Sequence, residues 1–219
     1  MDSTVAHTIP EDLSADLFEA LAALDEGLDN VAPGPSEGDL DAVLDRLLLW
    51  VRRLLRADAG SIYLRHGDML RLALAQNDTI DDRMGPAEIQ LRLQGLELPL
   101  SPASIAGYVA LTGDVVNVAD VASVPRDAPW AHCSALDRRL YSYHAILSVP
   151  IEDVSGEIMG VFQFFNALDE DGRPAAFRPG VEAVVFRFAV RAARLITRRG
   201  ARGLPPSLRV NGAQISGQG

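Results

Sequence analysis

The only cysteine of the chain, Cys133, is the side chain best suited to nucleophilic chemistry or to carrying a covalently bound group. It lies between His132 and Ser134. A thiol that reduces a sulfoxide forms a sulfenic acid, and a second cysteine is then needed to close an internal disulfide. The sequence also shows no Ser–His–Asp ordering, no metal-binding cluster and no glycine-rich phosphate loop. We therefore predict that the protein is not an enzyme.

The acidic run from Asp169 to Gly172 is superficially similar to a calcium-binding loop. Such a loop ends on a bidentate glutamate at a fixed spacing, and no glutamate occupies that position here. We interpret the run as the turn that follows a strand, so the sequence predicts no metal site.

The charge of the chain is unevenly distributed. Residues 1–50 contain 12 acidic residues and one basic residue, whereas residues 51–219 contain 18 acidic and 19 basic residues, which together give the net charge of −10. Nucleic-acid-binding proteins usually present a basic face, so the acidic N-terminal region argues against such a partner. We attribute the acidic charge to solvated helix faces.

The sequence contains no recognisable membrane or secretion signal. No apolar run reaches the roughly 18–20 residues that cross a bilayer, and the N-terminus lacks the basic and apolar regions of a signal peptide. A single cysteine excludes an internal disulfide framework and is typical of a reducing compartment. We expect a cytoplasmic protein without a membrane partner. Whether the chain is complete or a fragment of a longer protein stays open.

The chain is organised around residues 144–166. Two apolar runs, Ala145 to Ile151 and Ile158 to Phe165, flank a polar turn that contains Gly156, a pattern that predicts an antiparallel hairpin. Neither run alternates cleanly between polar and apolar residues, so we expect both strands to be covered on two faces. Pro150 predicts a bulge or an edge near the end of the first strand.

Three long helices are expected. In residues 1–30, five leucines at positions 13, 17, 21, 24 and 28 predict a helix with one narrow apolar stripe. Residues 31–38 are rich in Pro and Gly and read as a linker. A second helix, from Ser36 or Asp39 to Arg56, and a third, from Pro179 to Arg198, each carry apolar residues on two sides, so each is predicted to pack on a sheet and on another helix. Residues 199–219 read as a disordered tail or a linker.

Shorter elements occupy the middle of the chain. Residues 61–65 and 69–75 flank a glycine-containing turn and predict a hairpin, and a further strand is expected near Ile89–Leu93. Ser101–Ser104 is predicted to cap a short helix over residues 105–111 that Gly113 ends. Residues 115–118 predict a strand, and residues 119–140 a loop with a short helix.

The order and spacing of these elements over residues 39–198 resemble a GAF domain. The Ile-Ala-Gly helix, the Val-Val-Asn-Val and Ile-Leu-Ser-Val-Pro-Ile strands, the Gly-Val-Phe-Gln-Phe-Phe-Asn strand and the closing helix introduced by Phe177 and Pro179 carry the resemblance. It implies an α+β fold of three layers, with an antiparallel sheet of about six strands. Long terminal helices would cover one face of the sheet, and short helices and loops would roof a ligand pocket on the other.

The sequence is most similar to GAF domains that accompany cyclic-nucleotide enzymes. Their motif of Asn-Lys, then Phe, then Asp-Glu is matched at Asn166, Phe177 and Glu182. The chain departs from it at Ala167, where Lys is expected, and at Val181, where Asp is expected. The ion pair that ties a loop beside the pocket in those relatives is therefore absent here.

The resemblance also implies a set of pocket residues. Ser61, Ile105, Ala106 and Asp137 match positions that contact the nucleotide in those relatives, while Arg139 and Tyr143 replace threonines and Gln163 replaces a glutamate. The Gln163 amide could read an exocyclic amine or carbonyl because it offers both a donor and an acceptor. The alternative is that Ile105 and Ala106 serve only helix–sheet packing and that Gln163 is a satisfied polar group.

The resemblance leaves several functions to compare. The favoured one is a non-catalytic sensory module that binds a small molecule, with a cyclic nucleotide as the candidate ligand, and that signals to an effector as a homodimer through residues 39–56 and 180–198. The alternative is a dimerisation module without a ligand. A bilin photoreceptor would attach its chromophore near Cys133, but those relatives follow that cysteine with His rather than Ser134. Neither His132 nor His144 matches the axial position of haem-binding relatives.

Overall fold

The structure is a computed structural model that describes residues 37–85, 88–131 and 141–200, with side chains described from Leu40 to Thr197 within those ranges. The helix predicted in residues 1–30, most of the linker predicted at 31–38 and the tail beyond residue 200 lie outside the described residues. His132, Cys133, Asp137 and Arg139 also lie outside them.

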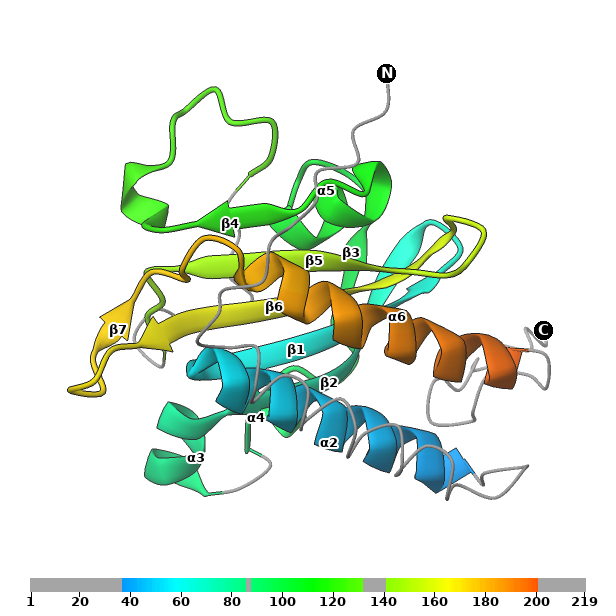
Figure 1. The fold of residues 1–219 in the computed structure, drawn as a ribbon, viewed down its shortest axis with the longest axis horizontal. Helices are drawn as coiled ribbons and strands as arrows, with labels where there is room; N and C mark the ends of the chain where they lie inside the picture. The colour runs from blue at the N-terminus through cyan, green and yellow to red at the C-terminus, as the bar shows by residue number, and fades with distance from the viewer. Residues whose placement is uncertain (1–36, 86–87, 132–140, 201–219) are drawn as a thin grey trace, which may run out of the picture.

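One antiparallel sheet forms the middle layer of the molecule (Figure 1), which confirms the predicted α+β fold. Its strand order is β3-β2-β1-β6-β5-β4, and a short β7 pairs with the end of β6. The strands are β1 (Ala57–His66), β2 (Met69–Asn77), β3 (Glu97–Pro99), β4 (Val116–Val118), β5 (Ile146–Glu152), β6 (Ile158–Leu168) and β7 (Pro174–Ala175).

The hairpin predicted at 144–166 is β5 and β6, at the centre of the sheet, and β6 also pairs with β1 on its other side. The turn is closed by the Asp153 carboxylate, which accepts hydrogen bonds from the backbone N–H groups of Ser155 (2.8 Å) and Glu157 (3.0 Å). Gly156 takes a φ of 83° that favours glycine. The pairing becomes irregular between Ile151 and Glu152, directly after Pro150, as the proline predicted.

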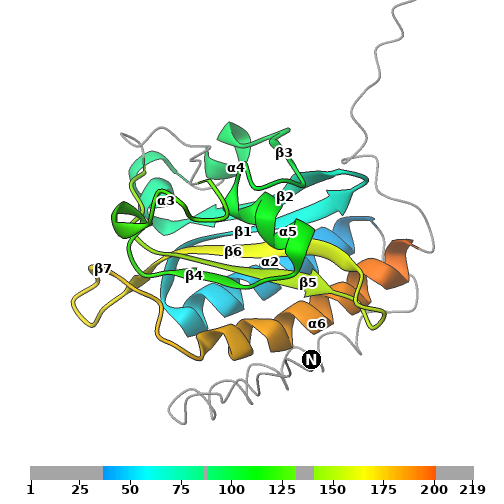
Figure 2. The same ribbon diagram turned by 90° about the horizontal axis from the view of Figure 1, so that it is seen from above.

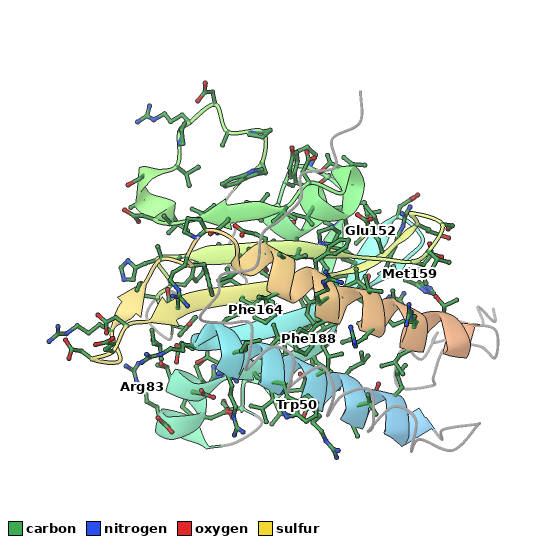
Figure 3. The ribbon with its side chains drawn as sticks, in the orientation of Figure 1. Trp50, Arg83, Glu152, Met159, Phe164 and Phe188 are labelled. Carbon is green, nitrogen blue, oxygen red and sulfur yellow. The ribbon has the colours of Figure 1, made fainter. Side chains whose placement is uncertain are left out.

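The two long helices, α2 (Glu37–Leu55) and α6 (Val181–Gly200), lie side by side on one face of the sheet (Figure 2). The alternate residues Phe162 and Phe164 of β6 and Leu147 and Val149 of β5 point into the core between helices and sheet. Phe188 of α6 is fully buried in the same core, close to Phe164 (Figure 3). None of the helices in the described ranges is long and apolar enough to cross a membrane.

The other face of the sheet is covered by short elements: α3 (Asp78–Met84), α4 (Glu88–Arg92), α5 (Ile105–Thr112) and the 3₁₀ helix η1 (Val121–Ser123). The predicted capping of α5 is confirmed, since the Ser104 hydroxyl accepts from Gly107 N at 3.0 Å and Gly113 ends the helix in a left-handed conformation. Asp169 forms the expected turn between β6 and β7, accepting from the backbone N–H groups of Asp171 and Arg173.

The prediction of a strand near Ile89–Leu93 is wrong, because residues 89–92 belong to the helix α4. A five-residue segment with apolar residues at alternate positions fits either a strand or a short helix, but in the structure Ile89 is buried while Leu91 is 67% exposed. Two interactions favour the helix. Arg92 and Glu88, one helical turn apart, form an ion pair of 2.7 Å. The Gln90 side chain hydrogen-bonds with the edge of β2, accepting from Ala75 N and donating to Ala73 O.

Gly160 of β6 allows β1 to approach closely, because a Cβ at this position would collide with the carbonyl oxygen of Tyr63. We predict that Gly160→Ala lowers the free energy of unfolding by about 1–3 kcal/mol, since the two central strands must separate to admit the methyl group. Urea denaturation measures this change. Val154→Ala, at a 94% exposed position on the same hairpin, serves as the control and should leave stability unchanged. Equal stability of both variants would contradict the prediction.

Candidate ligand pocket

A cavity of about 70 Å³ lies between the sheet and the short elements that cover it. It is larger than the space that one buried water occupies, about 10–15 Å³ on the same kind of measure. Strands β1, β2 and β6, helices α4 and α5, and the segment that leads into β5 all contribute to its wall. The lining residues are Ala59, Gly60, Ser61, Tyr63, Ala75, Gln76, Asn77, Ile89, Leu93, Leu98, Ser104, Ile105, Ala106, Tyr141, Tyr143, Ile146, Gln163 and Phe165.

The cavity brings together the predicted site residues that the structure describes. Ser61, Ile105, Ala106, Tyr143 and Gln163 all line it, although they come from four separate parts of the chain. Asp137 and Arg139 lie outside the described residues. This arrangement shows that the five residues share one cavity, and their contact with a ligand stays a prediction.

Three polar side chains form a row across the sheet, and two of them, Ser61 and Gln163, line the cavity. Gln163 of β6 is the cross-strand partner of Ser61 on β1 and of Ser148 on β5. Its Nε2 donates to Ser148 Oγ at 2.9 Å. Ser61 Oγ is buried and has no hydrogen-bond partner among the residues that the structure describes. A buried hydroxyl without a partner costs about 1–3 kcal/mol, so a polar ligand atom at this position would relieve an existing penalty.

The wall of the cavity beside this row is aromatic. The rings of Tyr143 and Phe165 are 5.0 Å apart between centroids and tilted by 59°, and Tyr141 lies 6.4 Å from Tyr143. Aromatic side chains bury large apolar area and favour stacked or edge-to-face contact with flat rings. A planar heterocycle with hydrogen-bonding edges therefore matches both the wall and the floor.

Helix α5 covers the cavity, and its first two residues are the predicted ligand contacts Ile105 and Ala106. Both residues are almost fully buried and belong to the core cluster between α5 and the sheet. Gly107 lets this end of the helix sit tightly, because a Cβ there would collide with the backbone oxygens of Pro99 and Ser101. The packing role considered for Ile105 and Ala106 is therefore observed, and it leaves both side chains on the cavity wall.

Asn166 fastens the segment that closes the cavity to the sheet. This residue has a φ of 51°, and its Oδ1 accepts from His144 N at 2.7 Å and Ala145 N at 3.3 Å. Its Nδ2 donates to Tyr141 Oη and Ser142 O, both at 3.2 Å. The asparagine of the expected motif thus anchors residues 141–145 to the sheet, although the sequence lacks the ion pair of that motif.

The other two motif residues act at the start of α6. Phe177 is buried in the core between helices and sheet. Glu182 accepts from Gly180 N through Oε2 and from Asn117 Nδ2 of β4 through Oε1, both at 2.7 Å. The glutamate therefore joins the N-terminal turn of α6 to the strand β4, which lies beneath the roof.

The sequence did not single out Arg52, which connects α2 to the cavity wall. Its guanidinium is 3% exposed, forms an ion pair with Asp78 at 2.8 Å and donates to Gln76 Oε1 at 3.2 Å. Gln76 lines the cavity and also donates to the Asp45 carboxylate of α2 at 2.8 Å. In the sequence Arg52 resembles the neighbouring, exposed Arg53, so no local signal distinguishes it.

Tyr141 links this part of the wall to Asn166. Burial, followed by the negative charge of Asp58, raises the pKa of Tyr141 far above its ordinary value, so its hydroxyl stays protonated. Asp58 also accepts from Thr79 Oγ1 at 2.9 Å, and the backbone carbonyl of Asp58 accepts from Arg52. A continuous polar network therefore runs from α2 to the segment over the cavity.

Comparison with known proteins agrees with this architecture. The model of the GAF domain family matches residues 39–196. A cGMP-specific 3',5'-cyclic phosphodiesterase from Drosophila mojavensis is 27% identical over 172 residues, covering 76% of this chain and 14% of that protein. The corresponding protein from Drosophila melanogaster is 28% identical over 152 residues, covering 67% of this chain and 13% of its own length. The chain thus spans a small part of these relatives.

Solved structures share the fold at low sequence identity. The GAF domain of an Acinetobacter phosphoenolpyruvate-protein phosphotransferase superposes with a TM-score of 0.63 at 19% identity, covering 87% of this chain and 98% of that one. A free methionine-R-sulfoxide reductase from Neisseria meningitidis superposes with a TM-score of 0.59, also at 19% identity, covering 89% and 96%. The same fold therefore occurs in a domain of a phosphotransferase and in a sulfoxide reductase, so the fold does not decide the function.

We predict that Asn166→Ala lowers the free energy of unfolding by at least about 2 kcal/mol, because it leaves the N–H groups of His144 and Ala145 without their acceptor. Asn166→Gly should be less destabilising than Asn166→Ala, since glycine tolerates the positive φ at this position.

Urea denaturation of both variants measures these effects. Asn117→Ala, which removes an exposed hydrogen bond, is the matched control and should change stability by no more than about 0.5 kcal/mol. Asn166→Ala with the stability of this control would contradict the anchoring role.

Proposed function

Since the chain belongs to the GAF domain family, we propose that it is a non-catalytic regulatory module that binds a small molecule in the cavity between sheet and roof. A cyclic nucleotide is the first candidate ligand. Binding is passed through the long helices to an effector domain or signalling protein. We propose that the module acts in the cytoplasm, because a single cysteine is typical of a reducing compartment.

The observation that carries this proposal is the buried hydroxyl of Ser61 on the cavity wall, which has no hydrogen-bond partner within the described part of the chain. It lies in register with Gln163, whose Nε2 donates a hydrogen bond to Ser148 on the next strand. Buried polar groups in proteins are almost always paired, so an orphan at the bottom of a cavity favours a ligand that completes the row. A purely structural core would more readily carry an apolar residue at position 61.

The chemistry of the cavity supports a purine-like ring. Gln163 offers a carbonyl and an amide N–H to the edge of a heterocycle, and Ser61 can donate or accept. Tyr143 and Phe165 provide aromatic surface beside them. The relatives that match the chain are named for cGMP, which makes cGMP and cAMP the ligands to test. Asp137 and Arg139 are proposed to contact the nucleotide as well.

Two sets of polar contacts join the long helices to the rest of the domain, and one of them includes the cavity-lining residue Gln76. Arg52 and Asp45 of α2 both hydrogen-bond with Gln76, and Glu182 of α6 accepts from Asn117 of β4. A ligand shifts a conformational equilibrium only if it binds one state more tightly than the other. Ordering of the roof over a bound ligand would meet this condition, because the roof contributes part of the binding surface.

We propose a homodimer through residues 39–56 and 180–198 as the signalling unit. The two helices lie on one face of the sheet and leave Phe186 40% exposed. Exposed apolar side chains on long helices are typical of helix–helix interfaces. This surface is separate from the cavity, so dimerisation and ligand binding can be measured independently.

The alternative is a dimerisation module whose cavity takes no ligand. It would be favoured if aromatic side chains filled the space. Phe162 points to the opposite face of the sheet, into the helix core, and the Tyr108 hydroxyl hydrogen-bonds Asp114 at the surface. Of Tyr108, Tyr143 and Phe162, which would fill the space in that alternative, Tyr143 alone lines the cavity. The ligand-binding proposal is therefore the better supported of the two.

Titration of the purified protein with cGMP and cAMP tests the proposal. A ligand that binds the folded state alone must raise the melting temperature, by several degrees at a large excess over its dissociation constant. We predict such a rise for at least one of the two nucleotides, and a loss of affinity of about tenfold or more in Gln163→Leu, because one hydrogen-bonding edge is removed.

Asp127→Asn, at an exposed position on a surface loop, is the control and should bind as the unaltered protein does. Native mass spectrometry of the protein as purified from cells would detect a ligand that is already bound. A bare polypeptide that neither nucleotide stabilises would overturn the cyclic-nucleotide proposal and favour the alternative.

A further inference from the structure

Six of the residues that line the cavity form two adjacent rows across the strands β2, β1 and β6. In that strand order, the rows are Ala75, Ser61 and Gln163, and Asn77, Ala59 and Phe165. Asn77 and Gln163 thus carry amides at opposite corners of the two rows. The side chains between these corners on β1 and β2 are small, which leaves the space above them open. The corner at Asn77 is not used by the ligand contacts proposed so far.

The two ends of the Asn77 amide have different surroundings. Asn77 is only 1% exposed, and its Oδ1 accepts from Ile80 N at 2.9 Å, which caps α3. The cap identifies the oxygen end of the amide, because only the oxygen can accept a hydrogen bond. Among the described residues, Nδ2 donates to no other group. Buried polar groups are almost always paired, so Asn77 and Ser61 each bring a group without a partner to one cavity.

Capping alone does not require an amide at position 77. Serine and aspartate cap a helix about as well as asparagine, because the cap uses a side-chain oxygen and nothing else. The N–H groups of Nδ2 are therefore left over when the cap is formed. At a position on the cavity wall, they form a hydrogen-bond donor aimed at whatever occupies the cavity.

We propose that Asn77 is a specificity-determining ligand contact, which donates through Nδ2 to a carbonyl oxygen or an unprotonated ring nitrogen of a heterocycle. This inference rests on the proposed function, since it adds a contact in the same cavity. Ser61 and Gln163 contact one edge of the heterocycle, and Asn77 contacts the opposite edge. A ligand with an N–H group at this position is rejected, because two donors would then face each other.

The same contact joins the ligand to α3 and, through it, to α2. Helix α3 begins at Asp78, whose carboxylate pairs with Arg52 of α2 at 2.8 Å. The next residue, Thr79, donates to the buried Asp58 at 2.9 Å. A ligand that holds the Asn77 amide in place therefore also holds the cap and the first turn of α3. Ligand binding should make this turn open less often.

Binding of purine probes to Asn77→Ser tests the contact, because serine keeps the cap and removes the amide N–H groups. The probes are cGMP, cAMP, guanosine and adenosine, measured by isothermal titration calorimetry. We predict that at least one probe binds the unaltered protein and that Asn77→Ser weakens its binding by about tenfold or more. Asp82→Ser, at an exposed position on the same helix, is the matched control and should bind as the unaltered protein does.

Asn77→Ala separates the contact from the cap. If Nδ2 contacts the ligand, Asn77→Ala and Asn77→Ser weaken binding equally, although Asn77→Ala has the lower melting temperature of the two because it also loses the cap. If Asn77 serves as a cap alone, Asn77→Ser binds as the unaltered protein does, which would overturn the contact and leave the cyclic-nucleotide proposal standing. Binding of a nucleoside but of neither cyclic nucleotide, with the same loss in Asn77→Ser, would support the contact and overturn the cyclic-nucleotide ligand. Binding of none of the four probes would overturn both.

Hydrogen–deuterium exchange measures the effect of the contact on α3. At a saturating concentration of the probe that binds most tightly, the Ile80 amide should exchange several-fold more slowly in the unaltered protein, because opening of the first turn then requires loss of the ligand contact. Asn77→Ser, saturated with the same probe, should not show this slowing. Equal slowing in both proteins would contradict the contact between Asn77 and the ligand.

Discussion

The register of β6 is the constraint on which both layers of the molecule depend. Its side chains alternate strictly, so that Phe162 and Phe164 enter the core beneath α2 and α6 while Val161, Gln163 and Phe165 face the opposite layer. A shift by one residue would exchange these sets and would place the Gln163 amide in an apolar core. Pairing with β1 and β5 fixes the register on both sides. The stability of the helix layer and the chemistry of the cavity therefore rest on the same strand.

The two layers communicate through side chains at the ends of this sheet. Asn166, near the end of β6, holds the segment over the cavity, and its Nδ2 reaches Tyr141. Arg52 reaches the cavity wall from α2 through Gln76 and the backbone of Asp58. Both groups are buried, so each depends on its full set of partners and tolerates little displacement. We propose that a change in the roof is passed to α2, because the connecting groups cannot lose their hydrogen bonds without cost.

The sequence predicted the architecture well where pattern and local chemistry agreed. The hairpin of β5 and β6, the Ser104 cap of α5 and the turn at Asp169 follow from residue types at fixed spacings, and the structure has all three. The helix α4 was missed, because five residues around Ile89 fit either period and the decision lay in the contacts of Gln90 with β2. Tertiary contacts of this kind leave no local signal.

In the candidate site, too, the sequence predicted the residues that have a local signal and missed the features that tertiary contacts decide. Ser61 and Gln163 could be placed in the pocket by resemblance, but the orphan state of the Ser61 hydroxyl and the bond from Gln163 to Ser148 depend on cross-strand register. Arg52 could not be told from Arg53, because burial distinguishes them and composition does not. Asn166 was expected from the motif, but its four side-chain hydrogen bonds depend on the return of residues 141–145 to the sheet, which the sequence does not indicate.

The most direct test of the central claim is an NMR titration of the isotopically labelled protein with cGMP and with cAMP. If the cavity is the binding site, the amide side chain of Gln163 and the rings of Tyr143 and Phe165 will show the largest shifts. Arg52 should follow at the same ligand concentration, because it is joined to the cavity wall. Saturable shifts confined to surface residues, or no shifts with either nucleotide, would contradict the account.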